Sequence, residues 1–488
     1  MSVLLPESFL SLGILSIILL FSLWSNGKSY STKASAMVLL ATLALCIQSL
    51  GSPEKIIWWQ GMFIQDKLAQ FAKILLCCTT LVIVLCSENE QKDFGFPTLE
   101  FNILILLSTL GMLVTVSAGH LITLFVGLEL MYLPLYALVA MRKKHLQAQE
   151  AAIKYIVTGA LASAFFLYGA SLLYGVSATM ELRGIESALF NLLSNNIGGM
   201  EKIPLIDNYI LAVFATVMIL AALIFKFGTV PFHMWVPDVY QGSTHIAISV
   251  IGSLPKFVLV VVWSRLFGYQ GALSPMSDIW APPLLILGVL SILYGNLLGL
   301  VQTNIKRLLA YSSIAHMGYI LLALGMASQI GMQSAFVYVL GYIIVSVTLF
   351  ITLAQFRKAG DEMTKIDDFK GLYYRHPGYA LVFTIALFSL IGVPPVLGFI
   401  VKMQLIFSLI EQNLAEIAIL AVLGSVLGAY YYLSIIQRMM FQKATDSVVS
   451  IQLQYARISV LLITIGSTML ILFSFIPYGL FEFAQIVV

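Results

Sequence analysis

Residues 226–237 read KFGTVPFHMWVP and residues 388–402 read FSLIGVPPVLGFIVK, and these two stretches decide the fold. Each is part of a membrane-length apolar run, is interrupted by glycine and proline, and carries a lysine near the interruption. Proline disrupts a helix, and backbone groups freed at membrane depth must lie against protein or water. Interrupted spans in corresponding positions of two halves are typical of inverted-repeat transporters. We therefore expect broken transmembrane helices beside an internal polar path.

The rest of the chain has the composition of a membrane protein. Of its 488 residues, 60% are hydrophobic and 10% are charged, whereas a soluble domain has about 25% charged residues. Runs of about 20 apolar residues recur along the chain, and the alternating strands of a β-barrel do not. The 14 runs lie near residues 5–24, 34–51, 68–87, 99–117, 121–141, 151–176, 208–231, 243–267, 281–301, 306–326, 332–355, 378–410, 417–437 and 458–482. The sequence predicts an all-α integral membrane protein with about 14 transmembrane helices.

The broken spans divide the chain into four predicted segments. These are N-terminal transmembrane helices, a first five-helix repeat, a second five-helix repeat and a C-terminal transmembrane helix, over residues 1–98, 99–267, 281–437 and 438–488. An odd number of spans in each repeat forces the second copy to be inverted. The correspondence is loose at residue level, because Lys226 precedes its glycine–proline element and Lys402 follows its own. Met1–Pro6 carries no lysine or arginine, so we expect a retained first helix and not a cleaved signal.

The charges of the loops predict the orientation. With both termini outside, 16 lysines and arginines fall in cytoplasmic loops and 4 in external loops. The cytoplasmic set is Lys28, Lys33, Lys92, Arg142, Lys143, Lys144, Lys306, Arg307, Arg357, Lys358, Lys365, Lys370, Arg375, Arg438, Lys443 and Arg457, and the external set is Lys55, Lys67, Arg183 and Lys202. The positive-inside rule favours this orientation and an even number of spans.

Four ionisable residues lie inside the apolar spans: Glu129, Lys226, Lys256 and Lys402. A charge at the bilayer centre costs roughly 2.5–3.5 kcal/mol on insertion scales, so such residues usually have a function. A buried lysine can bind and release a proton, which an arginine does not do. The structural alternatives are a helix–helix hydrogen bond from protonated Glu129 and lysines that extend to the membrane surface. Lys256 lies near the middle of its span, so its side chain is the least able to reach the membrane surface.

Histidine and cysteine give weaker signals. His233, His245 and His316 lie near the lysines, and we predict them as proton-relay candidates, although a histidine in an apolar span is more often a structural core residue. They lack metal-ligand spacing. The cysteines are all in apolar spans or at their ends, and adjacent Cys77 and Cys78 suit neither a zinc site nor a thioredoxin-like pair. The chain has no dinucleotide, phosphate-loop, haem or iron–sulfur motif, so we expect it to bind no redox cofactor.

Three stretches together resemble a known family. They are LELMYLPLYALVA at 128–140, FKFGTVPFHMWVPDVYQGSTHIAISVIGSLPK at 225–256, and NIKRLLAYSSIAHMGY at 304–319. They are similar to the antiporter-like, proton-conducting subunits of respiratory complex I, the NADH:quinone oxidoreductase. The K-x4-PFH-x-W-x-PD element at 226–238 is highly specific. Lys402 and the absence of histidine from 332–355 favour the N type within this family.

The resemblance implies a mechanism and a setting. The family's fifth-span glutamate pairs with a seventh-span lysine, and an eighth-span lysine connects to a twelfth-span lysine; these correspond to Glu129, Lys226, Lys256 and Lys402. Electron transfer from NADH to quinone would drive protons along this path. FMN, iron–sulfur clusters and quinone are then expected elsewhere in the complex. The implied partners are the other membrane and peripheral subunits and the lipid bilayer, with no nucleic acid, in a bacterial inner (plasma) membrane.

Three alternatives stay open from the sequence. An Mrp-type cation/proton antiporter shares the lysine–proline–histidine–tryptophan element, and a membrane subunit of an energy-converting hydrogenase has a similar pattern. A structural scaffold is disfavoured by the four buried charges. Co-purification with flavin and iron–sulfur proteins would favour complex I, and sodium-dependent antiport without them would favour the Mrp type.

Overall fold

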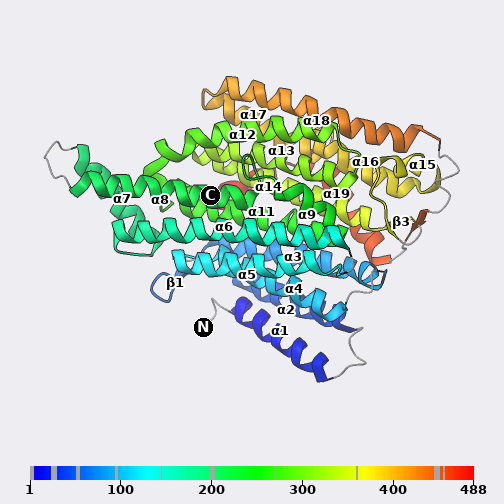
Figure 1. The fold of residues 1–488 in the computed structure, drawn as a ribbon, viewed down its shortest axis with the longest axis horizontal. Helices are drawn as coiled ribbons and strands as arrows, with labels where there is room; N and C mark the ends of the chain where they lie inside the picture. The colour runs from blue at the N-terminus through cyan, green and yellow to red at the C-terminus, as the bar shows by residue number, and fades with distance from the viewer. Residues whose placement is uncertain are drawn as a thin grey trace.

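Long apolar helices cross the molecule side by side (Figure 1). The computed structural model describes residues 5–23, 30–50, 55–93, 97–143, 145–197, 204–269, 271–358, 361–443, 451–453 and 457–487. Within these residues, 13 helices are long and apolar enough to cross a membrane. A further span is made of two half-helices, α16 (Pro377–Ile391) and α17 (Leu397–Glu411). The prediction of an all-α membrane protein with about 14 spans is confirmed.

Several helices begin and end close to the predicted spans, and short elements fill the connections. The other helices are α1 (Leu5–Leu23), α2 (Ser31–Ser49), α3 (Lys67–Asp93), α4 (Thr98–Val116), α5 (Leu121–Ala140), α6 (Leu146–Ser177), α7 (Leu182–Ile197), α8 (Pro204–Phe227), α9 (Trp235–Gly242), α10 (His245–Ile251), α11 (Leu254–Phe267), α12 (Ser277–Leu300), α13 (Ile305–Gly325), α14 (Gln329–Ala354), α15 (Leu372–Arg375), α18 (Ala415–Phe441), α19 (Arg457–Phe475) and α20 (Tyr478–Val487). Strands β1 (Ile56–Trp58) and β2 (Phe63–Gln65) form a hairpin, and β4 (Asp361–Glu362), β3 (Phe356–Lys358) and β5 (Ile451–Leu453) form a small sheet in that order.

Both predicted interruptions have the same local geometry. Helix α8 ends at Phe227, and Gly228 then takes a positive φ of 70° before the chain continues into α9. Helix α16 ends at Ile391, and Gly392 takes a positive φ of 86° before α17. Glycine suits both positions because it lacks the Cβ that disfavours this conformation. The shared geometry fits two related repeats, and the boundaries 99–267 and 281–437 stay predictions.

The span expected as one helix over 243–267 is also interrupted. It consists of α10 and α11, with Gly252 and Ser253 between them. Pro255 lies in the first turn of α11, where its missing N–H costs no helical hydrogen bond. A Cβ on Gly252 would lie 2.5 Å from the hydroxyl of Tyr240, so a side chain here would have to displace that tyrosine. Lys256 therefore also lies directly after a helix interruption.

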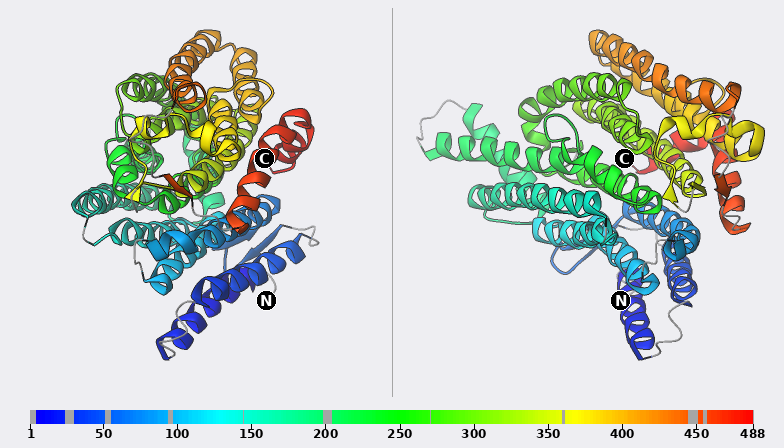
Figure 2. Two further views of the ribbon diagram at one scale, coloured as in Figure 1. Left: turned by 90° about the vertical axis from the view of Figure 1, so that its right-hand side faces the viewer. Right: turned by 45° about the vertical axis from the view of Figure 1, so that its right-hand side comes forward.

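Burial separates an inner group of helices from an outer group. In the most apolar 18-residue stretch of each span, all residues of the α10–α11 span and 94% of those of α13 and α14 are buried, against 39% for α1 and 22% for α19. The inner helices pack against one another and against helices of both halves of the chain. The N-terminal helices lie at one end of the molecule and α18 lies near the other (Figure 2). The protein interior, and not lipid, therefore surrounds Lys256 on α11 and His316 on α13.

Some residues used to predict the orientation carry no structural description. Lys28, Lys144 and Lys202 lie outside the described residues, and so do the side chains of Lys92 and Lys358.

Candidate functional site

Glu129 on α5 and Lys226 on α8 lie together, as the sequence predicts. The Lys226 Nζ is 3.6 Å from Glu129 Oε1 and donates a hydrogen bond of 3.5 Å to Ser163 Oγ on α6. Ser163 in turn donates to the Glu129 carboxylate. The lysine side chain is buried, and its ammonium lies 4.2 Å from the centre of the Tyr132 ring. At 3.6 Å, two unit charges attract by about 5 kcal/mol at an effective dielectric of about 20.

The helix interruption contributes to the position of Lys226. The residue lies in the last turn of α8, directly before the chain leaves the helix at Gly228. Carbonyl groups at a helix C-terminus carry partial negative charge and favour a cation there. Two local features therefore stabilise a charged lysine at this depth: the carboxylate of Glu129 and the end of α8.

Lys256 on α11 is surrounded by hydroxyl groups. Its ammonium hydrogen-bonds to Ser313 on α13 and lies 3.4 Å from the Tyr240 hydroxyl and 3.3 Å from the Tyr342 hydroxyl. Its side chain is buried, and the Tyr342 ring centre is 5.0 Å from the ammonium. Hydroxyls both donate and accept hydrogen bonds, so they can partner either the charged or the neutral form of the lysine.

Lys402 on α17 reaches back across the second interruption. Its Nζ donates to the carbonyl oxygens of Leu390 at 2.8 Å and Ile391 at 2.9 Å, and to Ser425 Oγ on α18 at 3.1 Å. The two carbonyls belong to the last turn of α16, where backbone acceptors have no helical partner. Lys402 is 9% exposed, so it is an interior residue and does not extend to the membrane surface.

His316 lies between Lys256 and Lys402. Its Nδ1 hydrogen-bonds with the Tyr338 hydroxyl at 2.7 Å, and its ring centre is 5.5 Å from that of Tyr342, a neighbour of Lys256. A cavity of about 20 Å³ is lined by His316, Tyr338, Tyr342 and Lys402 among others, and it has roughly the room that one water molecule needs. The structure thus brings His316, Lys256 and Lys402 into one polar region.

The other two histidines have their contacts elsewhere. The ring of His233 packs edge to face on Tyr294 of α12, with ring centres 4.5 Å apart. His245 begins α10 and lies 3.2 Å from Glu362 of β4. Of the three predicted relay histidines, only His316 therefore contacts the surroundings of the lysines.

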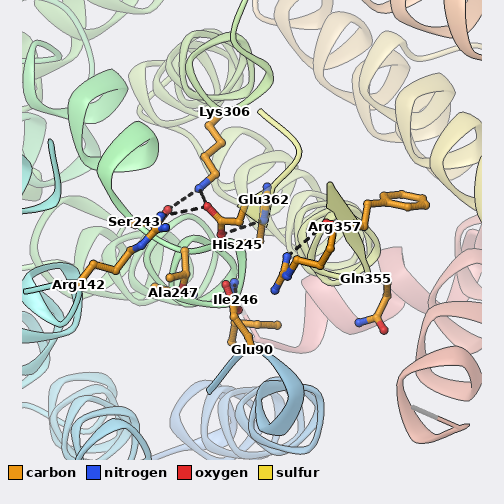
Figure 3. Close-up of polar contacts among 12 residues, drawn as sticks. Glu90, Arg142, Ser243, His245, Ile246, Ala247, Lys306, Gln355, Arg357 and Glu362 are labelled. Atoms are coloured by element: carbon orange, nitrogen blue, oxygen red, sulfur yellow. Dashed lines mark hydrogen bonds and ion pairs between the residues drawn. The ribbon is translucent and has the colours of Figure 1, made fainter. Parts of the chain in front are cut away.

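Glu362 is the centre of a buried charge cluster that the sequence analysis missed (Figure 3). Lys306 forms an ion pair with it and donates a 2.7 Å hydrogen bond to the carbonyl of Ser243, and Arg142 lies 3.2 Å from Glu362. Burial alone would raise the pKa of Glu362, but Lys306, His245 and Arg142 together hold it well below its usual range. The sequence assigned Lys306 and Arg142 to loops, whereas the Lys306 side chain is 1% exposed and Arg142 15% exposed. Glu362 is one of four acidic residues in the segment 356–377, so nothing in the sequence singled it out.

This cluster also contains the one group of side chains with metal-ligand geometry among the described residues. Glu90, His245 and Glu362 each place a ligand atom within 4.8 Å of the others. Glu90 already accepts a hydrogen bond of 2.9 Å from the backbone N–H of Ile246. Glu362 is already paired with Lys306 and Arg142, so a metal ion would have to displace those cations. The cluster is better described as an ion-pair network.

A second buried ion pair lies near the first helix. Lys73 on α3 is 2.6 Å from Glu7 on α1, with side chains 2% and 7% exposed. Ser117, at the end of α4, donates to the same carboxylate at 3.5 Å. Both charges lie near span ends, so their depth could not be predicted from the sequence. This pair joins α1 and α3 to the end of α4.

Comparison with known proteins places the chain in a family. The family model described as NADH:quinone oxidoreductase/Mrp antiporter, TM, matches residues 118–428. The chain is 38% identical over 443 residues to NADH-quinone oxidoreductase subunit N of Thiobacillus denitrificans. This alignment covers 91% of this chain and 89% of that protein. Subunit N of Laribacter hongkongensis is 36% identical over 91% of this chain and 88% of its own length. The chain belongs to the subunit N family of NADH-quinone oxidoreductase.

Chains of solved membrane complexes have the same fold as this chain. A chain of respiratory complex I from Thermus thermophilus, solved with bound aureothin, matches with a TM-score of 0.76 and 28% identity over 98% of both chains. A chain of an archaeal membrane-bound sulfane sulfur reductase matches with a TM-score of 0.85, and one of the Mrp complex from Dietzia sp. with 0.82. These two are 23% and 18% identical to this chain, so they show the shared fold alone.

Proposed function

We propose that this chain is the proton-translocating membrane subunit N of a bacterial NADH-quinone oxidoreductase, and that protons move through Glu129, Lys226, Lys256 and Lys402. The subunit lies in the inner membrane with the other membrane and peripheral subunits of the complex. The observation that carries the proposal is the position of the three lysines: each is buried at a helix interruption, beside groups that can exchange a proton with it.

The first pair works as a charge-controlled proton site. Lys226 holds its proton while Glu129 lies close, because the carboxylate stabilises the ammonium form. Displacement of either group weakens this attraction in inverse proportion to distance, and the proton is then released more readily. Electron transfer from NADH to quinone in other subunits supplies the energy for this displacement.

The second part of the path receives and passes on the proton. Between the two lysines, the Tyr342 hydroxyl hydrogen-bonds with Lys256 and the His316 ring hydrogen-bonds with the Tyr338 hydroxyl. These three residues and Lys402 line the same small cavity. A hydroxyl or a histidine ring accepts a proton on one side and donates one on the other. We assign His316 as the relay between the two lysines. FMN, iron–sulfur clusters and quinone belong to other subunits in this proposal, and the chain contributes proton transfer and no electron transfer.

The test is replacement of Lys226 by alanine in the intact complex. We expect proton pumping in proteoliposomes to be lost and NADH:quinone reductase activity to fall. Lys33→Ala, which removes an exposed lysine from α2, is the matched control and should behave as wild type. Wild-type pumping by Lys226→Ala would remove this residue from the mechanism. If the chain instead purified without flavin and iron–sulfur proteins and catalysed sodium-dependent antiport, the Mrp-type alternative would replace the proposal.

A further inference from the structure

A basic pocket opens at the end of the molecule that is predicted to face outward. Its volume is about 460 Å³, and it lies between the beginnings of α3, α7 and α14 and the end of α11. Four cations and one carboxylate line it: Lys55, Lys67, Arg183, Arg265 and Asp66. Lysine and arginine are scarce on the external side of membrane proteins, yet three of the four in the predicted external loops line this single pocket. This concentration of positive charge fits an anionic ligand.

Most of this positive charge is not neutralised by the protein. Asp66 pairs with Arg265 at 2.5 Å. Within the part of the chain that the structure describes, Lys55, Lys67 and Arg183 have no ion-pair partner. Burial and the charge of Arg183 lower the pKa of Lys55, so the like charges disfavour one another. A bound phosphate group would relieve this repulsion, because its oxygens accept hydrogen bonds from guanidinium and ammonium groups.

An apolar groove lies deeper in the membrane, between α3, α14 and α19. Its volume is about 550 Å³, and its lining residues include none that is charged. On α3, the residues that line the pocket or the groove include a series at intervals of three or four: Lys67, Phe71, Leu75, Cys78 and Val82. Residues at this spacing lie on one face of a helix. The same face of α3 therefore runs from the basic pocket into the groove.

Helices α14 and α19 form the other walls of the groove. On α14, Met332 lines the pocket, and Leu340 and Val347 line the groove two and four turns farther along. A Cβ on Gly466 of α19 would lie 2.2 Å from Thr348 Oγ1, so α19 packs closely on α14 at this point. Only 22% of the residues in the most apolar stretch of α19 are buried within the chain. Since the groove lies at membrane depth and is apolar, an acyl chain suits it.

We propose that the basic pocket and the apolar groove together bind one anionic phospholipid, with its phosphate group in the pocket and an acyl chain in the groove. A cationic pocket followed along the same helices by an apolar groove matches the two chemically different parts of a phospholipid. Lys55, Lys67 and Arg183 hold the headgroup, because their charges have no partner among the described residues. The site is independent of the proposed proton path, since none of the residues that line either cavity belongs to that path.

Photo-crosslinking of the intact complex in phosphatidylcholine vesicles tests this site. Phosphatidylglycerol with a diazirine on one acyl chain is compared with phosphatidylcholine that carries the same group, and the cross-linked peptides are mapped by mass spectrometry. We expect the phosphatidylglycerol probe to label residues 71–82 of α3 and 340–351 of α14 at least about fivefold more strongly, because only its headgroup carries a net negative charge. Equal labelling by the two probes would show only a general lipid-facing surface, and absence of labelling would show that a neighbouring subunit fills the groove. Either result would overturn the proposal.

A double variant tests the contribution of the basic pocket. Lys67→Gln/Arg183→Gln removes two of its unpaired cations and should lower labelling of the groove by the phosphatidylglycerol probe about tenfold. Lys33→Gln/Lys443→Gln removes two exposed lysines elsewhere and is the matched control, which should label as wild type. Labelling is normalised to the flavin content of the complex, and the comparison of the two probes needs only the wild-type complex, so it holds even where the variant assembles poorly. Unchanged labelling in Lys67→Gln/Arg183→Gln would overturn the placement of the headgroup in the pocket.

Discussion

Replacement of Glu129 by glutamine tests the first proton site with the least change in shape. The amide keeps the size of the side chain and an oxygen that can accept from Ser163, but it removes the negative charge 3.6 Å from Lys226. The lost attraction is about 5 kcal/mol at an effective dielectric of about 20. The ring of Tyr132 stays 4.2 Å from the ammonium in both proteins, so its attraction for the lysine cancels in the comparison. The change of about 5 kcal/mol corresponds to a preference for the charged lysine that is lower by roughly a thousandfold or more.

We expect this change to slow the coupled reaction by at least about tenfold, because Lys226 then releases its proton before the redox step can drive it. The assay follows NADH oxidation with quinone and proton pumping in proteoliposomes that contain the intact complex. Glu416→Gln, which neutralises an exposed carboxylate at the start of α18, is the control for loss of a charge. Normal turnover and normal pumping in Glu129→Gln would show that the pair is a structural contact, and the reasoning from its charge would fail.

Three further predictions concern ion pairs outside the lysine path. Glu362→Gln should lower the free energy of unfolding by about 3–5 kcal/mol, because it leaves buried cations without their carboxylate, and thermal unfolding in detergent measures this. Burial raises the pKa of Asp66, but the Arg265 guanidinium, 2.5 Å from the carboxylate, lowers it by more than burial raises it. The pKa of Asp66 is therefore lower in the folded protein than in the unfolded chain. Asp66→Asn should therefore destabilise the protein above about pH 3.9 and lose this effect as the pH falls through the folded pKa; equal destabilisation at pH 7 and pH 3 would contradict this. Glu7→Gln should lower stability through Lys73 and leave pumping per assembled complex unchanged, so a pumping defect would show that this pair has a role in proton transfer.

The sequence predicted the candidate site best where an ionisable residue lies well inside a long apolar span. Glu129 lies near the middle of a long apolar span, and Lys226 lies five residues before a proline, so both signals pointed to a buried site. The depth of Lys402 in the membrane was harder to predict, because its apolar span of about 30 residues is longer than one membrane crossing requires. Its position follows from the interruption at Gly392, which turns α17 so that the ammonium meets the free carbonyls of α16.

The sequence failed where a polar segment folds back into the interior. Lys306 and Arg357 read as loop cations by composition, yet both are buried. The cause is a tertiary contact: β4 places Glu362 against the ends of several helices, and long-range pairing of this kind leaves no periodic signal. The interruption between α10 and α11 was also missed. A Cβ on Gly252 would lie 2.5 Å from the Tyr240 hydroxyl, and this tertiary contact cannot be read from the local sequence.

Substitutions of Lys256 distinguish proton exchange by the buried lysines from the mere presence of a positive charge. Lys256→Arg keeps a positive charge among the same hydroxyls but cannot release a proton, whereas Lys256→His keeps an exchangeable proton on a shorter side chain. The measurement is the number of protons pumped per NADH oxidised by the reconstituted complex. We expect the arginine variant to be as defective as Lys256→Ala and the histidine variant to retain part of the activity. Wild-type pumping by the arginine variant would show that Lys256 needs only to carry a charge.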